Sequence, residues 1–415
     1  MSKEIIIIGG GIIGLCSAYY IQKEGHRVTV IDQSNMDSGA SYVNAGYLSP
    51  SHIIPLSAPG VMKKGLKWML DKSSPLYIKP RLDLDFLKWT WAFNKSCSTN
   101  NVAKAIPAIK DIALLSQDLY DGIKARDNFR FHYEKKGLFM LCQTDKALEE
   151  EIKVAEIAKN EGLEVSTLSE NDIKKLEPNT TISTVGATYY QCDSHTTPHE
   201  FMEDMKIHLK ASGVVFRLNE PVDDLTISNG KIIAIQTSKE ELKADDFVLA
   251  AGSWSSRISK KLGIKLLLQA GKGYRINTKQ DTGITIPAIL TERKVAITPM
   301  NGFTRFAGTM EIAGINHSIN KARVEAIDSG VQEYYPDIKL TDSEKLDAAS
   351  GLRPVSPDGL PYIGKSSKCN NLAIASGHAM MGWSMATATG KLVSEIITDS
   401  KPSIPIDAFN PDRKF

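Results

Sequence analysis

A chain of 415 residues is long for one compact core, so two domains are the natural expectation. Its charge is nearly balanced, with 50 basic against 48 acidic residues, and it therefore lacks the global basic field that nucleic acid requires. The five cysteines are scattered without a C-x-x-C pair, which argues against a zinc site, an iron–sulfur cluster or a disulfide framework. We accordingly predict no metal and no nucleic-acid partner.

The chain begins with the pattern of a complete dinucleotide-binding βαβ unit. The β-branched run Ile5–Ile8 suits a strand buried on both faces. Residues 9–14 then supply G-x-G-x-x-G, a helical pattern covers 12–22, and 28–31 form a second strand. A lone glycine motif is weak evidence, but here strand, turn, helix and second strand are in register. The pattern therefore predicts nucleotide binding.

Each part of this unit has a physical task. Gly9 permits the tight turn, Gly11 lets the backbone approach a pyrophosphate, and Gly14 lets the helix pack close to the strand. The unpaired N–H groups of the helix N-terminus face the phosphates, and Asp32 at the end of the second strand can accept hydrogen bonds from a ribose.

The N-terminus carries no recognisable targeting segment. Charged residues come first, and only four isoleucines precede the glycines, which is too short for a signal-peptide core or a membrane span. We therefore expect a cytoplasmic protein.

Strand and helix patterns alternate through the rest of the sequence. Thr197–Glu200 has the form of a capping box with proline at the first helical position. Asn229-Gly230 between two strand patterns predicts a hairpin. The other expected elements are a small-residue loop 38–46, helices 103–126, 145–161 and 198 to about 213, strands 214–216, 222–227, 232–237, 246–249 and 372–375, a strand-rich stretch 270–340, and a helix 384–397.

Several short motifs, in this order, resemble the D-amino-acid oxidase-type family of FAD-dependent amine oxidoreductases. Within that family the resemblance is to the bacterial D-amino-acid dehydrogenase small subunits, and it spans nearly the whole sequence. The motifs that carry it are Asn44-Ala45-Gly46, Ala58-Pro59-Gly60-Val61, Lys67-Trp68-Met69, Lys272-Gly273-Tyr274, Gly351-Leu352-Arg353-Pro354 with Pro357-Asp358-Gly359, and Gly377-His378 with Gly382-Trp383.

The resemblance implies an α/β fold of two discontinuous domains. An FAD-binding Rossmann-like domain of the glutathione-reductase type would comprise 1–60, 190–265 and 345–415. An α+β substrate-binding domain with a mixed or antiparallel sheet would comprise 61–189 and 266–344.

The resemblance also changes the expected nucleotide from NAD to FAD. Sarcosine-type relatives tether flavin through a cysteine, and the segment Arg305–Glu311 has none, so we expect non-covalent FAD. The residues expected to hold it are Gly9, Gly11, Ile12, Ile13, Gly14, Asp32, Gln33, Ser41, Asn44, Ala45, Gly46, Val222, Ala251, Gly252, Trp254, Gly377, His378, Met381 and Gly382.

Oxidising an amino acid requires its carboxylate to be fixed so that the α-hydrogen points at the flavin. The planar fork of an arginine suits this task, and in the resembling oxidases the arginine of the Gly-x-Arg-Pro segment performs it, which here is Arg353. The alternative is an arginine in an internal ion pair. Arg275 and Arg305 are weaker candidates and are expected to be structural.

Three further residues near the implied site each have a structural alternative. Tyr274 would close over the substrate, or would be a strand aromatic in the core. His378 would hydrogen-bond the flavin ring, or would support its own loop. His195 lies in Asp193-Ser194-His195, where the sequence differs from its resembling relatives; it would meet a polar substituent of the substrate, or would be a solvated loop histidine.

Tryptophans and lysines alternate in residues 61–93. Such a segment can seat a protein on a membrane surface, where an enzyme can pass electrons to a quinone as the resembling dehydrogenases do. The alternative is that Trp68, Trp89 and Trp91 pack inside the substrate domain. Contact with the cytoplasmic face of the inner membrane therefore stays open.

The leading hypothesis is an FAD-dependent dehydrogenase that oxidises a D-amino acid to its imine by hydride transfer to flavin N5. The imine then hydrolyses to a 2-oxo acid and ammonia. A second hypothesis is a D-proline or cis-4-hydroxy-D-proline dehydrogenase that forms a cyclic imine, and a third is a glycine or sarcosine oxidase using oxygen. An inactive flavin-binding scaffold is a different class, disfavoured because Arg353 and the 377–382 loop are present.

Overall fold

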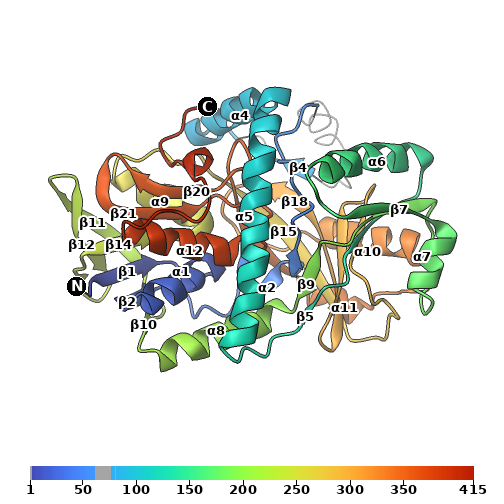
Figure 1. The fold of residues 1–415 in the computed structure, drawn as a ribbon, viewed down its shortest axis with the longest axis horizontal. Helices are drawn as coiled ribbons and strands as arrows, with labels where there is room; N and C mark the ends of the chain where they lie inside the picture. Colours follow the sequence, from blue (N-terminus) through green and yellow to red (C-terminus); the bar gives the residue numbers. More distant parts are fainter. Residues whose placement is uncertain (1, 61–75, 80) are drawn as a thin grey trace.

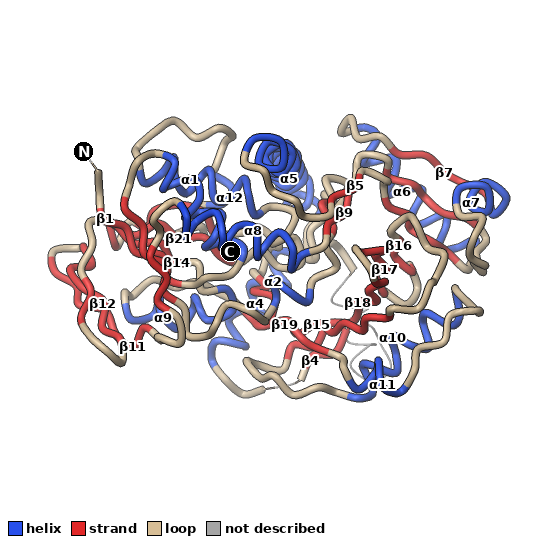
Figure 2. The backbone as a smooth tube through the Cα atoms, turned by 90° about the horizontal axis from the view of Figure 1, so that it is seen from below, coloured by secondary structure: helices blue, strands red, loops and turns tan. Residues whose placement is uncertain are grey.

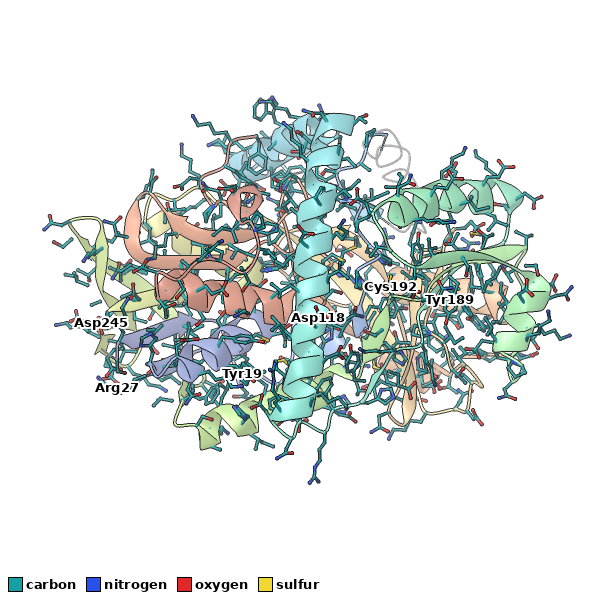
Figure 3. All side chains as sticks on the ribbon, viewed as in Figure 1. Tyr19, Arg27, Asp118, Tyr189, Cys192 and Asp245 are labelled. Atoms are coloured by element: carbon teal, nitrogen blue, oxygen red, sulfur yellow. The ribbon has the colours of Figure 1, made fainter. Side chains whose placement is uncertain are left out.

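A computed structural model of the protein describes residues 2–60, 76–79 and 81–415. The predictions for Lys67, Trp68 and Met69 lie outside the described residues. Figure 1 shows two sheet regions on either side of the long helix α5 (Thr99–Arg126), which stands upright in the middle of the molecule. In Figure 3, Arg27 and Asp245 lie at the outer end of the first region, and Tyr189 and Cys192 lie on the other side of α5.

The first sheet is built on the N-terminal unit that the sequence predicts. Strand β1 runs between two parallel neighbours, so that Ile5 pairs with Val28 and with Asp246. In this sheet the described pairs of neighbouring strands are parallel, except that β20 runs antiparallel to β21. The order is β10 (Val215–Arg217), β2 (Arg27–Ile31), β1 (Glu4–Ile8), β14 (Asp246–Leu249), β21 (Cys369–Ser376) and β20 (Tyr362–Ser366).

Both faces of this sheet are covered, which explains the unbroken isoleucine run. Ile5 and Ile7 pack toward α1 (Ile12–Lys23) and α12 (Ala386–Ile397). Ile6 and Ile8 pack on the opposite face against a three-stranded sheet of β11 (Val222–Ser228), β12 (Lys231–Thr237) and β13 (Glu241–Leu242). Figure 2 shows these layers from below. The predicted hairpin is confirmed, with Asn229 and Gly230 both at positive φ.

The second sheet is large and mixed. Most of its described neighbours are antiparallel, and β16–β6 and β18–β4 are parallel. Its order is β19 (Ala349–Val355), β15 (Gln269–Thr278), β18 (Phe303–Ile312), β17 (Val295–Met300), β16 (Ala288–Leu290), β6 (Leu138–Cys142), β8 (Gly186–Tyr190) and β7 (Val165–Ser169), with β4 (Leu76–Ile78) beside β18.

A small sheet links the two regions. It consists of β3 (Tyr47–Leu48), β9 (Ser194–Thr196) and β5 (Tyr133–Glu134). Among the described residues, the remaining helices are α2 (Ala40–Val43), α4 (Leu84–Ser96), α6 (Asp145–Asn160), α7 (Glu170–Leu176), α8 (Pro198–Ala211), α9 (Ser255–Lys261), α10 (Lys321–Tyr334) and α11 (Asp342–Leu346), and 3₁₀ turns cover Gly252–Trp254 and Asp407–Phe409.

The two-domain division stays a prediction at residue level. Strand β19 lies within 345–415, the range assigned to the first domain, yet it pairs in the second sheet. Helix α5 lies within 61–189, the range assigned to the second domain, yet it packs on α12 through the Ser116–Thr387 hydroxyl contact of 2.8 Å. Its buried residues belong to the same hydrophobic core as those of α1 and α12.

Two local predictions need correction. Residues 321–334 form helix α10 rather than strand, because Asn320 caps it by accepting a hydrogen bond from Ala322 N. Thr197 and Glu200 do not form a capping box. The Thr197 hydroxyl accepts from Asn301 N instead, and the Glu200 carboxylate accepts from His132 N.

The tryptophans of α4 divide between the two alternatives. Trp89 is buried and donates from Nε1 to the carbonyl of Val355 at 2.9 Å, so it packs in the interior as one alternative predicted. Trp91 is 62% exposed on the other face of the same helix. No helix among the described residues is long and apolar enough to cross a membrane.

Candidate functional site

A cavity of about 690 Å³ lies along the C-terminal ends of the first sheet's strands and reaches β19 of the second. This volume is within the range of about 300–1,000 Å³ typical of small-molecule sites. The ends of parallel strands are where α/β folds bind ligands, because helix N-termini and strand-end loops meet there. The cavity is therefore the candidate site.

The glycine motif forms one wall of the cavity. Gly9 has φ of +110°, and a Cβ on it would lie 2.4 Å from the carbonyl oxygen of Ala250, so the turn requires glycine. A Cβ on Gly11 would lie 3.2 Å from Ser41 Oγ, which itself accepts from Ile12 N. Gly14 lies behind this wall, where a Cβ would come within 1.9 Å of the Gly9 carbonyl oxygen. Its expected task of close helix–strand packing is thus reproduced.

Asp32 lines the cavity next to the glycines. One carboxylate oxygen accepts from Gly10 N at 2.7 Å, and the other accepts from the backbone and hydroxyl of Ser34 at 2.8 and 2.6 Å. These bonds orient the carboxylate and leave Oδ2 a lone pair for a further donor, because each oxygen can accept twice and Oδ1 already accepts two bonds.

Arg353 projects from β19 into the other end of the cavity. Its Nη1 donates to the carbonyl of Thr309 at 3.1 Å, and no carboxylate of the described residues forms an ion pair with it. Burial lowers its pKa to about 10, so the guanidinium is still charged at neutral pH. Within the described part of the chain, the internal ion pair considered as its alternative is absent.

Two backbone features hold this guanidinium in place. It lies over Gly273, where a Cβ would be 2.2 Å from both terminal nitrogens. The register between β15 and β18 shifts at Lys272/Tyr274, and Thr309 beside this bulge has φ of +59°. A bulge turns a backbone group out of the ladder, which here supplies the carbonyl that Arg353 binds.

His378 lies at the same end of the cavity and is buried. Its Nε2 lies 2.9 Å from the hydroxyl of Thr389 on α12. Burial lowers its pKa to about 3, so the ring is neutral at neutral pH. The ring therefore acts as a polar, uncharged group that is fixed by the following helix.

Most of the predicted cofactor residues come together here. Those that line the cavity are Gly9, Gly11, Ile12, Ile13, Asp32, Gln33, Ser41, Asn44, Val222, Ala251, Gly252, Trp254, His378 and Gly382. Those that do not line it are Gly14, Ala45, Gly46, Gly377 and Met381. Ala45, Gly377 and Met381 are direct sequence neighbours of residues that line the cavity.

Tyr274 follows the structural alternative. Its ring is buried in the core of the second sheet, and its hydroxyl donates to Glu311 at 2.9 Å. Side chains alternate along a strand, so Gly273 faces the cavity and Tyr274 faces away. Arg275 pairs with Asp347 at 3.0 Å, and Arg305 donates to the carbonyls of Tyr42 and Asn44, so both are structural as expected.

The Asp193–His195 segment does not line the cavity. Asp193 is buried and accepts from the backbone and hydroxyl of Ser51, and burial raises its pKa to about 7. The expectation that His195 meets the substrate is not reproduced, and the alternative of a solvated loop histidine is wrong. His195 lies on strand β9 and is fully buried because β3 and β5 flank it.

Sequence reasoning missed several lining residues. Arg257 and Lys261 enter from α9, and their spacing of one helical turn after the Ala-Ala-Gly segment is a signal that could have indicated them. His317 comes from a loop and had no such signal; its ring lies nearly parallel to that of Trp254, with 6.0 Å between the ring centroids. Gly351 also lines the cavity; a Cβ there would meet Val43 and the backbone of Ala40.

Comparison with known proteins finds a matching family and a similar relative for this chain. A family model described as "FAD dependent oxidoreductase" matches residues 4–396. The chain is 31% identical to a D-amino acid dehydrogenase of Bradyrhizobium diazoefficiens over 99% of this chain and 98% of the relative.

Solved structures share the fold at lower identity. Glycine oxidase from Geobacillus kaustophilus is 19% identical, with a TM-score of 0.80 over 100% of this chain and 99% of its own. L-proline dehydrogenase from P. horikoshii is also 19% identical, with a TM-score of 0.75 over 99% of this chain and 97% of its own. The Rossmann-like fold with a second mixed-sheet region is thereby confirmed.

Proposed function

The chain belongs to the DAO family of FAD-dependent oxidoreductases, and from this premise we propose that it oxidises a D-amino acid to the imine. The imine then hydrolyses to a 2-oxo acid and ammonia. FAD held along the cavity would supply the acceptor for the hydride that leaves the substrate α-carbon. The observation that carries the proposal is the charged guanidinium of Arg353, which enters the cavity without a carboxylate partner among the described residues.

The cavity suits FAD along its length. Gly9 and Gly11 line the cavity without a side chain between their backbone and a pyrophosphate, and Asp32 presents an oriented carboxylate for a ribose hydroxyl. Val222 and Arg353 both line this cavity. None of the five cysteines lines the described cavity, so we expect FAD to be held without a covalent bond.

Arg353 would bind the substrate carboxylate through two parallel hydrogen bonds. A guanidinium with one arm on the Thr309 carbonyl retains donors for both carboxylate oxygens, because its fork carries five N–H groups. This bond fixes two substrate atoms and so limits the directions in which the α-hydrogen can point. Positioning of this kind is the protein's main contribution when a cofactor supplies the chemistry.

No strong base is required if the amine arrives neutral. His378 is uncharged and held by Thr389, so it offers a fixed polar contact near the reacting end without competing for the carboxylate. The substrate proton that leaves with imine formation passes to water.

The proposal is tested by measuring which amino acids reduce the flavin. The purified yellow protein is mixed without oxygen with D- and L-amino acids, D-proline, cis-4-hydroxy-D-proline, glycine and sarcosine, and flavin absorbance is followed. We expect rapid bleaching by acyclic D-amino acids.

Other outcomes select the other hypotheses. Bleaching by cyclic amines alone assigns the activity to D-proline or hydroxy-D-proline, and bleaching by glycine or sarcosine assigns it to the oxidase class. If no amine bleaches the flavin, the catalytic proposal is rejected in favour of a flavin-binding scaffold. Reoxidation by oxygen or by a quinone analogue then identifies the electron acceptor.

We propose a quinone as acceptor and peripheral contact with a membrane through α4. One face of this helix is exposed and combines apolar with basic residues: Leu84, Leu87, Lys88, Trp91 and Lys95. Amphipathic side chains of this kind favour the membrane interface. Sedimentation with anionic phospholipid vesicles should carry the native protein down and leave the Leu84→Ser/Trp91→Ser variant in solution. Equal sedimentation of both proteins, or of neither, would reject contact through this face.

A further inference from the structure

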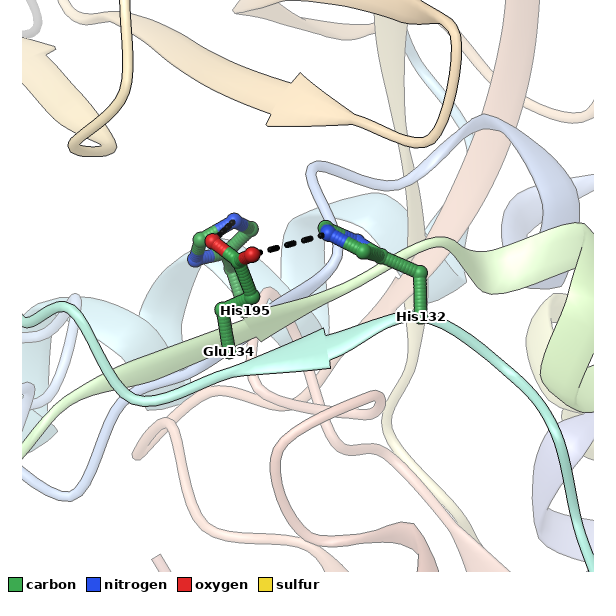
Figure 4. A group of neighbouring side chains, drawn as sticks. All are labelled: His132, Glu134 and His195. Atoms are coloured by element: carbon green, nitrogen blue, oxygen red, sulfur yellow. Dashed lines mark ion pairs between the residues drawn. The ribbon is translucent and has the colours of Figure 1, made fainter.

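Two histidines and a glutamate come together where strand β5 meets strand β9. Glu134 pairs directly with His195 in the antiparallel register, and His132 precedes Glu134 by two residues. Side chains two residues apart share a face of a strand, and directly paired residues project from the same face. The register therefore directs all three side chains to one point, as Figure 4 shows.

His195 is anomalous in this group. It is 0% exposed, and among the described residues neither of its ring nitrogens has a partner at full hydrogen-bond geometry. Buried polar atoms almost always have a partner, because leaving one unpaired costs about 1–3 kcal/mol. In its neutral form an imidazole offers a lone pair on one ring nitrogen, which can bind a metal ion.

The three side chains already have the spacing of metal ligands. His132 Nε2 lies 3.5 Å from Glu134 Oε1, and His195 Nε2 lies 3.9 Å from Glu134 Oε2. One ligand atom from each residue lies within 4.8 Å of the others. A tetrahedral Zn²⁺ with bonds of about 2.0–2.2 Å separates its ligands by about 3.3–3.6 Å, so small side-chain movements would complete the site.

The surroundings also suit a metal. His132 Nδ1 lies 3.2 Å from the Thr197 hydroxyl, and a proton on Nδ1 would point there and leave Nε2 free for a metal. Lys136 Nζ lies 2.8 Å from Glu134 Oε2 and is the cation that a metal would displace. The side chains of His132 and Glu134 are partly exposed, which gives an ion a path from solvent.

We propose that His132, Glu134 and His195 form a binding site for a divalent transition-metal ion such as Zn²⁺, with water as a fourth ligand. Two imidazoles and one carboxylate are a donor set that zinc accepts. The three residues do not line the cavity, so the proposal is independent of the proposed function. The metal would be structural, because it would tie β5 to β9. Strand β9 also contacts the cavity wall, since the Thr196 hydroxyl accepts a hydrogen bond at 2.8 Å from Nε1 of Trp383, which lines the cavity.

The test measures metal rather than turnover. The FAD-loaded full-length protein, purified without a polyhistidine tag and treated with a chelator, is titrated with Zn²⁺ in a calorimeter, and bound zinc is counted by elemental mass spectrometry. We expect one zinc per protein molecule and a higher midpoint of thermal unfolding with zinc. Each of the variants His132→Asn, Glu134→Gln and His195→Asn should bind zinc at least about 100-fold more weakly. Removing a residue that only hydrogen-bonds a metal ligand already weakens metal binding by about 10–100-fold, and removing a ligand itself should cost more.

The control is His199→Asn, which removes an exposed histidine on α8 outside the cluster and should leave zinc binding unchanged. Retained FAD absorbance shows that each variant is folded, and Glu134→Gln makes the mildest change. Failure of the native protein to bind zinc at micromolar concentration overturns the proposal. Unchanged zinc affinity in the folded variants overturns it equally.

Discussion

We expect Arg353→Ala to retain FAD and to be impaired in reduction of the flavin by every amino acid, with kcat/KM falling by about 30- to 4,000-fold. Removing one partner of a buried, hydrogen-bonded charge pair costs about 2–5 kcal/mol, and 1.4 kcal/mol is a factor of ten. Arg353→Lys keeps the charge without the planar fork, so its kcat/KM should lie between that of Arg353→Ala and that of the native enzyme. Stopped-flow bleaching without oxygen measures the rate, and visible absorbance measures bound FAD.

Two further variants separate the position of the guanidinium from its presence. Gly273→Ala keeps Arg353 but places a Cβ 2.2 Å from both terminal nitrogens, so the guanidinium must move. A displacement of about 1 Å can cost about 100-fold in rate. Arg275→Ala is the matched control, because its side chain pairs with Asp347 and does not line the FAD cavity. Native rates in Arg353→Ala would reject the carboxylate role, and an equal loss in Arg275→Ala would show that the effect is not specific.

The first sheet was predictable because its signals are local. The isoleucine run, the glycine spacing and Asp32 all lie within one short segment, and burial on both faces explains why every position of β1 after Glu4 is apolar. The hairpin at Asn229-Gly230 is likewise local, because two residues with positive φ define its turn.

Predictions failed where distant segments decide the environment. The alternation of β15 places Gly273 on the cavity side and Tyr274 in the core, and the sequence does not state which face is which. His195 is buried only because β3 and β5 flank it, and its neighbour His132 comes from a distant part of the sequence. The prediction of no metal rests on cysteine spacing and stays a prediction; the pairing of His195 with Glu134, on which the proposed zinc site depends, is not visible in that spacing.

The position of Arg353 shows what resemblance adds to local reasoning. Its motif indicated a carboxylate-binding arginine, but nothing in the sequence distinguishes an unpaired guanidinium from one in an ion pair. The structure supplies that distinction through the Thr309 carbonyl, which a bulge beside Gly273 turns toward the arginine. The feature that carries the proposed function is therefore a property of strand register rather than of composition.

The second large effect is expected at Gly14, where alanine should weaken FAD binding by about 5- to 150-fold. The added Cβ would lie 1.9 Å from the carbonyl oxygen of Gly9, which is backbone and cannot rotate away. Overpacking typically costs about 1–3 kcal/mol, and relief here requires α1 to move from β1 and to distort the loop that faces the pyrophosphate. Fluorescence titration of the apoprotein with FAD measures the change in Kd.

Gly122→Ala is the matched control, because it adds the same methyl group inside helix α5, where the nearest described atoms belong to the flexible end of Arg126. Alanine is favoured over glycine in a helix by about 1 kcal/mol, so this variant should bind FAD normally and unfold no earlier than the native protein. Native FAD affinity in Gly14→Ala would mean that the 9–14 loop does not set the position of the cofactor. Weakened binding in Gly14→Ala alone would instead tie FAD affinity to the separation between the first helix and the first strand, the feature that the glycine spacing predicts.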